Sequence, residues 1–314
     1  MGFKWTYKRA YWKVRSFLST HLGVSIKHSC YNGRQIMSIE DTGAYVKEKL
    51  LSGEKFAAGR IGGSELKVMI SFQSENKDMK LREKYHNLLM LLSGFFGDMN
   101  DLEDFDRLME RSIGSMDLMG VWFNQMEDVM LERYGAPHLK YGFLEGLEPW
   151  YCPDNPWSSA LKGKKVLVIH PYAESIEKQY RENREKIFPG TDILPEFELQ
   201  TIKAVQTLYL EKDERFAKWT DALYYMCKEA MKREFDVALV GCGAYGLPLA
   251  AFLADNGKSV IHMGGSLQLL FGIRGKRWDE MELLKPYYSD AWIRPSESEN
   301  LGGREKNVEN GCYW

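Results

Sequence analysis

Three short apolar segments, each ending in or followed by glycine or histidine, constrain the fold of this 314-residue chain more than any other feature. They are residues 164–170 (KKVLVIH), 236–241 (DVALVG) and 258–263 (KSVIHM). Helical patterns lie between and after them, at 173–187, 212–233 and 247–255, and 192–206 holds a further short strand after Pro195. Strands that alternate with helices form parallel sheets with right-handed crossovers. We therefore expect an α/β fold, with a Rossmann-like, mostly parallel sheet flanked by helices.

The part of the chain before residue 158 is rich in helical patterns. A helix is expected over 41–53, ending at Gly53, and a short strand over 55–59 (KFAAG) leads into a glycine turn. Leucine, methionine and phenylalanine recur with helical periodicity over 78–96 and 101–134. Residues 147–157 (LEPWYCPDNPW) predict a linker or a rigid aromatic loop. The expected parts are thus a basic segment (1–40), a helix-rich N-terminal portion (41–157) and a Rossmann-like part (158–314).

Charge is distributed unevenly along the chain. Residues 1–39 carry seven basic side chains and no acidic one, whereas the whole chain has 42 basic and 44 acidic residues. Apolar and aromatic residues in this segment recur at helical spacing, namely Phe3, Tyr7, Ala10, Tyr11, Val14 and Leu18. A basic amphipathic helix over residues 1–20 fits an anionic membrane surface, and it equally fits packing on the protein's own body. A net charge of −2 does not favour a nucleic-acid partner.

Composition excludes several classes of protein. Hydrophobic residues make up 44% and charged residues 27%, which are values of a globular chain. The five cysteines are scattered and form no CxxC pair, so neither a disulfide framework nor a structural zinc site is indicated. No apolar run approaches the roughly 18–20 residues that span a bilayer. We expect a cytoplasmic protein, with peripheral contact to the inner membrane face through the basic segment.

The strand ends carry residues suited to binding an anion. Gly241-Cys242-Gly243-Ala244-Tyr245-Gly246 forms a GxGxxG pattern between a strand and a helix, which suits a phosphate at the helix N-terminus or a tightly packed turn. His170 ends another strand, and His262 with Gly264 and Gly265 ends the third. A dinucleotide-binding fold would place an acid where His262 stands, so a nicotinamide oxidoreductase is disfavoured.

Basic residues and a second glycine turn extend this candidate site. Arg274, Lys276 and Arg277 lie among glycines and can neutralise a diphosphate, or they can be part of a solvated helix cap. In the helix-rich portion, Arg60 and Glu65 flank Gly62 and Gly63. A carboxylate at the start of a helix caps its N–H groups or helps to hold a divalent metal.

Several segments resemble glycosyltransferases of the GT-D fold, in a group of bacterial surface-polysaccharide proteins. Residues 55–66 (KFAAGRIGGSEL) are similar to the strand–turn–helix whose family motif reads RFGDGE. The resemblance continues through the segments HPYAESI (170–176), GCGAYGLPLAA (241–251), IHMGGSLQLLFGIRGKRW (261–278), WIRPSESE (292–299) and ENGCYW (309–314). It covers most of the chain after about residue 40.

The resemblance assigns residues one by one. Arg60, Gly62 and Glu65 match the motif, whereas the family's aspartate, which belongs to a DxE pair for metal and nucleotide sugar, falls on Gly63. Mn²⁺ or Mg²⁺ would therefore need Glu65 together with an acid from elsewhere, such as Glu196 or Glu198. Alternatively, Arg274, Lys276 and Arg277 replace the metal, and we favour this second arrangement slightly.

The resemblance implies transfer of a sugar from a nucleotide-diphosphate donor to a glycan or lipid-linked acceptor in cell-surface polysaccharide synthesis. Glu65, His170 and Glu174 are candidate bases for the acceptor hydroxyl. Trp150, Tyr151, Trp157, Trp278 and Trp292 are candidates for stacking on base or sugar rings, or for the core. Two alternatives remain: another transferase on the same scaffold, such as a pyruvyl transferase, and a nucleotide-binding or scaffold protein without catalysis.

Overall fold

The computed structural model describes residues 6–12, 14–15, 29–73, 79–208, 213–299 and 313. Within these residues one nine-stranded sheet has the order β1-β2-β5-β4-β3-β9-β8-β6-β7. The strands are β1 (Cys30–Tyr31), β2 (Arg34–Met37), β3 (Ala57–Gly59), β4 (Leu118–Val121), β5 (Lys140–Phe143), β6 (Lys165–His170), β7 (Glu198–Lys203), β8 (Val237–Val240) and β9 (Ser259–His262). All neighbours pair in parallel except β1 and β2. The α/β, mostly parallel fold is thus confirmed.

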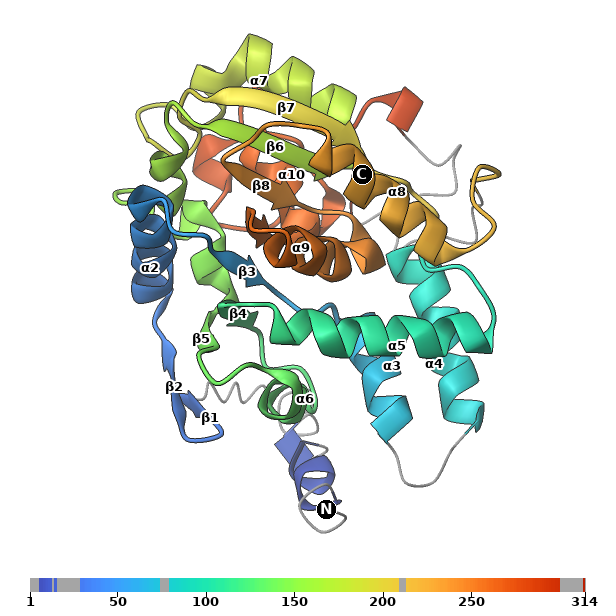
Figure 1. Ribbon diagram of the computed structural model, residues 1–314. Coiled ribbons are helices and arrows are strands. Elements are labelled where there is room, and N and C mark those ends of the chain that lie inside the picture. Colours follow the sequence, from blue (N-terminus) through green and yellow to red (C-terminus); the bar gives the residue numbers. More distant parts are fainter. Residues whose placement is uncertain are drawn as a thin grey trace.

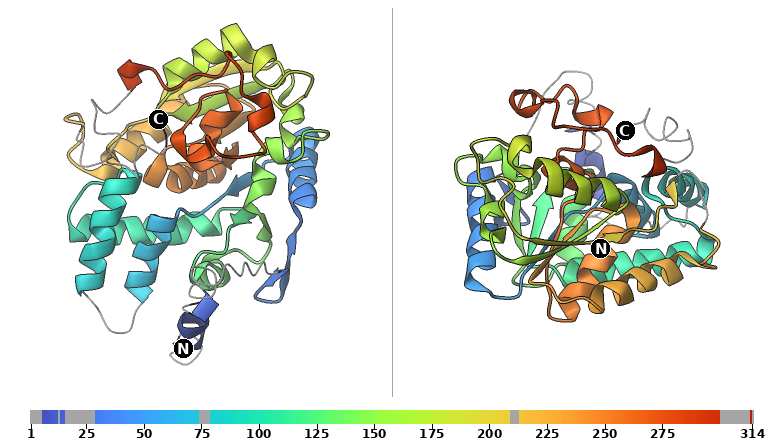
Figure 2. Two further views of the ribbon diagram at one scale, coloured as in Figure 1. Left: turned by 180° about the vertical axis from the view of Figure 1, so that it is seen from behind. Right: turned by 90° about the horizontal axis from the view of Figure 1, so that it is seen from above.

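Helices cover both faces of the sheet (Figures 1 and 2). They are α2 (Ile39–Ser52), α3 (Gly63–Gln73), α4 (Met79–Ser93), α5 (Met99–Gly114), α6 (Glu127–Tyr134), α7 (Ala173–Ile187), α8 (Trp219–Met231), α9 (Gly246–Asp255) and the short α10 (Leu267–Leu270). No helix in the described ranges combines the length and the apolar character that crossing a membrane requires.

Side chains alternate along the central strands between two hydrophobic cores. In β8, Ala238 and Val240 belong to the core formed with α3, α5, α8 and α9, whereas Val237 and Leu239 belong to the core formed with α2 and α7. This alternation follows from the two-residue period of a strand. Because both faces are covered, β8 is apolar throughout and β6 and β9 are apolar along most of their length, which is why these strands were recognisable as short apolar runs.

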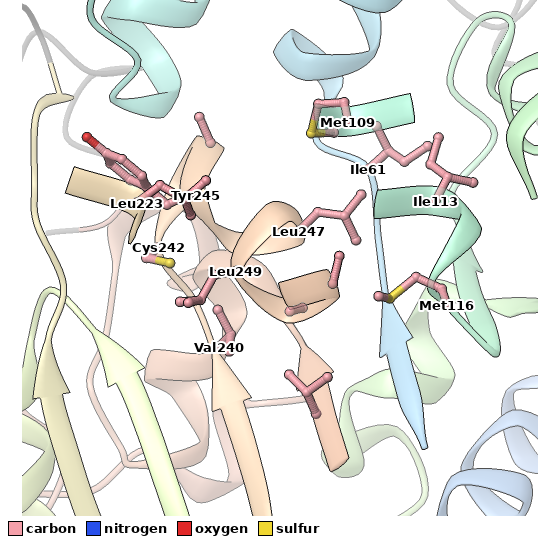
Figure 3. Packing of buried hydrophobic residues seen from close by; sticks show 14 of the residues in the cluster. Ile61, Met109, Ile113, Met116, Leu223, Val240, Cys242, Tyr245, Leu247 and Leu249 are labelled. Carbon is pink, nitrogen blue, oxygen red and sulfur yellow. The ribbon is translucent and has the colours of Figure 1, made fainter. Parts of the chain in front are cut away.

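Helix α9 links the sheet to the helices of the N-terminal portion. Figure 3 shows Leu247 directed from α9 toward Ile61 and Ile113, and Leu249 beside Val240 of β8. Strand β3 pairs with β9, so one continuous sheet joins residues 41–157 to residues 158–314. The carboxyl ends of parallel strands lie at one edge, and the two regions therefore supply residues to the same edge.

Most expected elements are present, with two corrections. The helix expected over 212–233 is shorter, because α8 spans Trp219–Met231 and residues 213–218 are not helical. Helix α2 begins after Ser38, whose Oγ accepts the Asp41 N–H at 3.0 Å, and ends at Gly53 with a φ of 73°. The expectation of helix over 101–134 is wrong in its middle, because α5 ends at Gly114 and β4 occupies 118–121. All four residues of β4 are buried, so its sequence lacks the alternation that marks a half-exposed strand.

Residues 144–161 form three short 3-10 helices, Leu144–Leu147, Pro149–Tyr151 and Trp157–Leu161. Trp150 and Trp157 within them are fully buried. Trp157 Nε1 also donates to the Leu147 carbonyl at 3.1 Å. Of the two predicted interpretations of 147–157, the structure therefore agrees with a rigid aromatic loop packed on the body.

Candidate active site

A pocket of about 230 Å³ lies at the carboxyl edge of the sheet. It is bounded by the segments that follow β3, β9, β8 and β6, which are four neighbouring strands. Twelve predicted site residues line it: Arg60, Gly62, Gly63, Glu65, His170, Gly241, Gly243, Tyr245, His262, Gly264, Gly265 and Arg277. The topology thus gathers residues that lie more than 200 positions apart in the sequence.

The first wall is the N-terminus of α3. The Glu65 carboxylate folds back over the start of its own helix, and a Cβ on Gly62 would overlap it. Ser64 Oγ donates to Glu65 Oε2 at 2.9 Å and lies 2.6 Å from Ser93 Oγ. Gly63 is different, because the nearest atom to a Cβ there is Asn124 Nδ2 at 3.9 Å. A side chain at position 62 would therefore displace the Glu65 carboxylate, whereas position 63 has room for a side chain.

Arg60 is held against an aromatic ring that the sequence did not reveal. Its Cζ atom lies 4.2 Å from the centroid of the Trp122 ring, which is cation–π distance. Trp122 Nε1 donates to the Ile61 carbonyl at 3.0 Å, so the indole is fixed to the same turn. Trp122 lines the pocket and directly follows β4, the strand that helical periodicity concealed.

The loop that carries Trp122 depends on a buried carboxyl group. Glu127 Oε2 accepts the backbone N–H groups of Trp122 and Phe123, at 3.3 and 2.9 Å, and the Tyr31 hydroxyl at 3.3 Å. Phe123 has a φ of 63°, so these bonds hold an unusual backbone conformation. Burial raises the pKa of Glu127 to about 8, against the opposing effect of its donors and of Arg60.

Two buried imidazoles face the pocket in opposite tautomers. His170 Nδ1 accepts the Tyr172 N–H at 3.0 Å, so its proton resides on Nε2. His262 Nδ1 lies 3.2 Å from the Val240 carbonyl, an acceptor, so here Nδ1 carries the proton and Nε2 accepts. Burial lowers the pKa of each to about 3, and Arg60 adds to this effect at His262. The pocket therefore contains one neutral N–H donor and one neutral nitrogen acceptor.

The glycines of the 241–246 turn allow close packing. A Cβ on Gly241 would lie 2.5 Å from the Gly264 carbonyl oxygen, and one on Gly246 would overlap the His262 ring. Gly243 has a φ of 57° and packs on the Ser93 backbone. Gly241 and Gly243 also line the pocket, so the residues that make the turn tight also form part of the pocket wall. Gly246 lies outside the lining.

Tyr245 is a wall residue fixed from two sides. Its ring stacks on Trp219 at 4.7 Å between centroids and 9° between planes. Its hydroxyl lies 2.9 Å from Thr207 Oγ1, and Thr207 donates to the Gly94 carbonyl. Because the ring is almost fully buried, it shapes the pocket wall and does not offer an open face for stacking.

The last wall is formed by the segment from Gly265 to Arg277 together with Tyr313. Arg277 Cζ lies 5.1 Å from the Tyr313 ring centroid, and Arg277 Nη1 donates to Tyr313 Oη at 3.4 Å. Gln268 Nε2 donates to the Tyr313 carbonyl at 3.1 Å. Gly265 has no room for a Cβ because the Tyr313 ring lies there. Tyr313 belongs to the ENGCYW segment, and the other residues of that segment lie outside the described part of the chain.

The remaining predicted site residues lie elsewhere. Arg274 contacts Asp279 Oδ1 at 3.1 Å and its Cζ lies 4.4 Å from the Tyr288 ring, outside the pocket. Lys276 is exposed and is not among the lining residues. Glu174 is exposed at the start of α7 and pairs with Lys203 at 2.8 Å. The basic cluster expected around 274–277 thus contributes Arg277 alone to the lining.

The described residues do not fit a divalent metal. They contain no group of three His, Cys, Asp or Glu side chains placed to hold one. The Glu65 carboxylate already accepts the Ser64 hydroxyl. Glu198 begins β7, and Glu196 precedes it, so both lie at the amino edge of the sheet and away from Glu65. We derive no chemical step through a metal.

The aromatic residues singled out from the sequence lie outside the pocket lining. Trp150, Trp157 and Trp292 are buried in the core on the α2 and α7 face, and Tyr151 and Trp278 pack against it. The aromatic residues that do line the pocket are Trp122, Tyr172, Tyr245 and Tyr313.

Comparisons with known proteins give a limited result. No protein-family model matches the chain, and no curated protein matches it. A solved structure described as a new glycosyltransferase from Streptococcus sanguinis is 13% identical, covers 84% of this chain and 96% of its own, and gives a TM-score of 0.37. A second, of the conserved domain of unknown function 1792 with a distinct glycosyltransferase fold, is 14% identical, covers 85% and 92%, and gives 0.36. Because these TM-scores are low, the interpretation of the site depends on its own residues.

Proposed function

We propose that the pocket binds a nucleotide-diphosphate sugar and that the protein transfers the sugar to a glycan or lipid-linked acceptor. One observation carries the proposal: cationic side chains, a helix N-terminus and two neutral imidazoles line a single pocket at the carboxyl edge of a parallel sheet. Ligands of open parallel sheets bind at that edge. The sequence resemblance to sugar transferases supports the same reading.

The charges of the pocket suit two linked phosphates. Its lining contains Arg60, Lys67 and Arg277 against the single carboxylate Glu65, and both histidines are neutral. The N-terminus of α3 adds a positive dipole end, which the Glu65 carboxylate over the same turn partly offsets. A departing diphosphate gains negative charge, so fixed positive groups at this place stabilise the transition state more than the bound donor.

The positions of Glu65, His170 and Glu174 show which of them can act as the base that deprotonates the acceptor hydroxyl. Glu174 lies outside the lining, and His170 uses Nδ1 to accept a backbone N–H. Glu65 is the carboxylate of the lining, and the Ser64 hydroxyl orients it. We therefore assign Glu65 to accept the proton of the acceptor hydroxyl, and His170 Nε2 to donate a hydrogen bond to the diphosphate.

A thermal-shift screen with nucleoside diphosphates tests donor binding. A ligand at 100 times its dissociation constant adds about 2.7 kcal/mol to stability, a readily measured shift. We expect a shift with a uridine or related diphosphate, a smaller shift in Arg277→Ala, and an unchanged shift in the matched control Lys276→Ala. Equal shifts in both variants would contradict the placement of the diphosphate beside Arg277.

Turnover is tested by release of nucleoside diphosphate from a panel of nucleotide sugars. Glu65→Gln is expected to retain the thermal shift and to lose release, because the amide cannot accept the proton. Binding without release in the parent protein would favour the alternative of a non-catalytic nucleotide-binding protein. Consumption of phosphoenolpyruvate instead of nucleotide sugars would favour the pyruvyl transferase.

We further propose that the N-terminal segment contacts an anionic membrane surface. Residues 6–12 and 14–15 are helical, and Lys8 and the buried Trp12 fasten them to the body, since Lys8 Nζ and Trp12 Nε1 bind the Asp128 carboxylate, the latter at 2.9 Å. Trp12 is buried, whereas Tyr7 and Val14 are 62% and 60% exposed. The expected apolar stripe thus faces away from the protein at these positions, while Phe3 and Leu18 lie outside the described residues.

Vesicle sedimentation tests this contact. We expect binding to phosphatidylcholine vesicles only when they contain phosphatidylglycerol, because residues 1–39 carry seven basic side chains and no acidic one. The double variant Tyr7→Ser, Val14→Ser is expected to bind less, and Leu51→Ser, which alters an equally exposed side chain on α2, is not. Equal binding of both variants would reject the contact.

A further inference from the structure

A second pocket, of about 380 Å³, opens beyond the carboxyl end of β7. It shares three wall residues with the first pocket, namely Pro171, Val205 and Gln206. A molecule in the second pocket is therefore separated from the first by one residue layer at the same sheet edge. No residue assigned above to the donor or to proton transfer lies in its lining.

The second pocket has an aromatic face beside a fixed, planar pair of polar groups. Arg215 binds Asp213 through two nitrogens, with Nε at 2.8 Å from Oδ1 and Nη2 at 2.5 Å from Oδ2. The Arg215 Cζ atom lies 5.3 Å from the Tyr225 ring centroid, and the Phe216 ring lies 5.3 Å from the same ring. Tyr225 is nevertheless 37% exposed, so part of it is open to a ligand.

The charges of this pocket are largely paired within the protein. Among the described residues, Arg215 binds Asp213, Lys203 pairs with Glu174, and Glu229 pairs with Lys232 at 2.5 Å. With Arg233, the lining of the second pocket has three cations against two carboxylates, whereas the first has three cations against one carboxylate. Paired charges give hydrogen-bond donors and acceptors without a strong net field, which suits a neutral ligand rich in hydroxyl groups more than a second phosphate.

We infer that the second pocket binds the saccharide end of the acceptor, with a sugar ring against Tyr225 and its hydroxyl groups on the Asp213–Arg215 pair. The apolar C–H face of a sugar packs on an aromatic ring, while its hydroxyls donate to a carboxylate and accept from a guanidinium. Because the two pockets share Pro171, Val205 and Gln206, the end of the acceptor that faces this wall lies next to the proposed donor pocket. This inference rests on the proposed function for its biological role, but the saccharide site itself is testable without turnover.

Saturation-transfer NMR with the methyl glycosides of glucose, galactose and N-acetylglucosamine tests the site directly. We expect signals from at least one glycoside with the parent protein, and about five-fold weaker binding in Tyr225→Ala. The matched control is Tyr224→Ala, which removes a neighbouring, 45% exposed ring of α8 that does not line the pocket, and it is expected to retain the signals. Tyr225→Phe keeps the aromatic face and is expected to bind like the parent.

Three outcomes overturn the inference. They are the absence of signal from all three glycosides with the parent protein, equal signals in Tyr225→Ala and Tyr224→Ala, and displacement of the glycosides by nucleoside diphosphate, which would place them in the first pocket. Failure of the proposed function would look different, because it removes the thermal shift with nucleoside diphosphates while leaving saccharide binding intact.

Discussion

Replacing Glu127 by glutamine should change how the stability of the protein depends on pH. Glu127 is 1% exposed, and burial raises its pKa to about 8 from an ordinary value of 4.5. Between these two values the unfolded chain has released the proton, whereas the folded protein still holds it. Stability contributed by this group is therefore fully present below pH 4.5 and is lost as the pH rises toward 8.

The expected magnitude follows from the difference in proton binding. One proton held by the folded state alone lowers the free energy of unfolding by about 1.4 kcal/mol per pH unit, so the loss over this window is on the order of 5 kcal/mol. Glutamine has the same shape and can accept the N–H groups of Trp122 and Phe123, but it does not titrate. Glu127→Gln should therefore gain stability over the parent protein as the pH rises.

Urea unfolding at several pH values measures this difference. The free energy of Glu127→Gln minus that of the parent should increase steadily from about pH 5 to pH 8. Other buried carboxyl groups with raised pKa values, such as Asp106 and Glu148, contribute equally to both proteins and cancel. Glu83→Gln, at an exposed position of α4, is the control and should run parallel to the parent. A constant difference for Glu127→Gln would refute the reasoning.

Three further predictions concern the pocket. Gly246→Ala should destabilise the protein by about 1–3 kcal/mol in urea unfolding, because its Cβ overlaps the His262 ring, whereas Gly63→Ala, with open space at its Cβ, should not. Trp122→Ala should weaken uridine diphosphate binding roughly five-fold by calorimetry, since Arg60 loses its cation–π partner, and an unchanged affinity would argue against that support. Affinity for a nucleotide sugar should stay flat between about pH 5 and pH 8, because the pKa values of His170 and His262 are about 3; a rise below pH 6.5 would show that one of them gains a proton.

The sequence was sufficient to predict those strands whose local residue pattern matches their burial. Strands β6, β8 and β9 are short, wholly or largely buried and bounded by glycine or histidine, so each was recognisable without knowledge of its neighbours. Their parallel order then placed His170, Gly241 and His262 at one edge, and the structure brings these residues into one pocket. That prediction relied on the rule that the carboxyl ends of parallel strands lie at one edge of a sheet, and it did not need the three segments to resemble one another.

The parts that were missed depend on long-range contacts. Strand β4 follows the end of α5 after only three residues and is itself apolar, and what makes it a strand is pairing with β3, where Asp117 Oδ2 also accepts the Ala57 N–H at 2.8 Å. Once β4 was taken for helix, Trp122 could not be placed at the sheet edge. Arg274 shows the opposite error, because it was predicted in the site but lies outside the pocket. Its proximity to Arg277 in the sequence does not reveal that the Asp279 side chain binds it. Side-chain pairs of this kind are decided by tertiary packing.

The position of the pocket explains why a charged arginine lies at its rim while neutral histidines lie inside it. The sheet is joined at β3 and β9, where two chain regions meet, and the segments after these strands must diverge to opposite sides. His262 is the last residue of β9 and packs on Gly246, and burial together with the charge of Arg60 keeps it neutral, whereas Arg277 comes from a surface turn and stays exposed. A diphosphate held by the exposed Arg277 would therefore meet the neutral His170 N–H donor at its inner end, whereas His262 Nε2 is an acceptor and suits a hydroxyl group instead. In the proposed sugar transfer, the negative charge of the departing diphosphate would then be stabilised from both sides, by the Arg277 cation and by the His170 N–H.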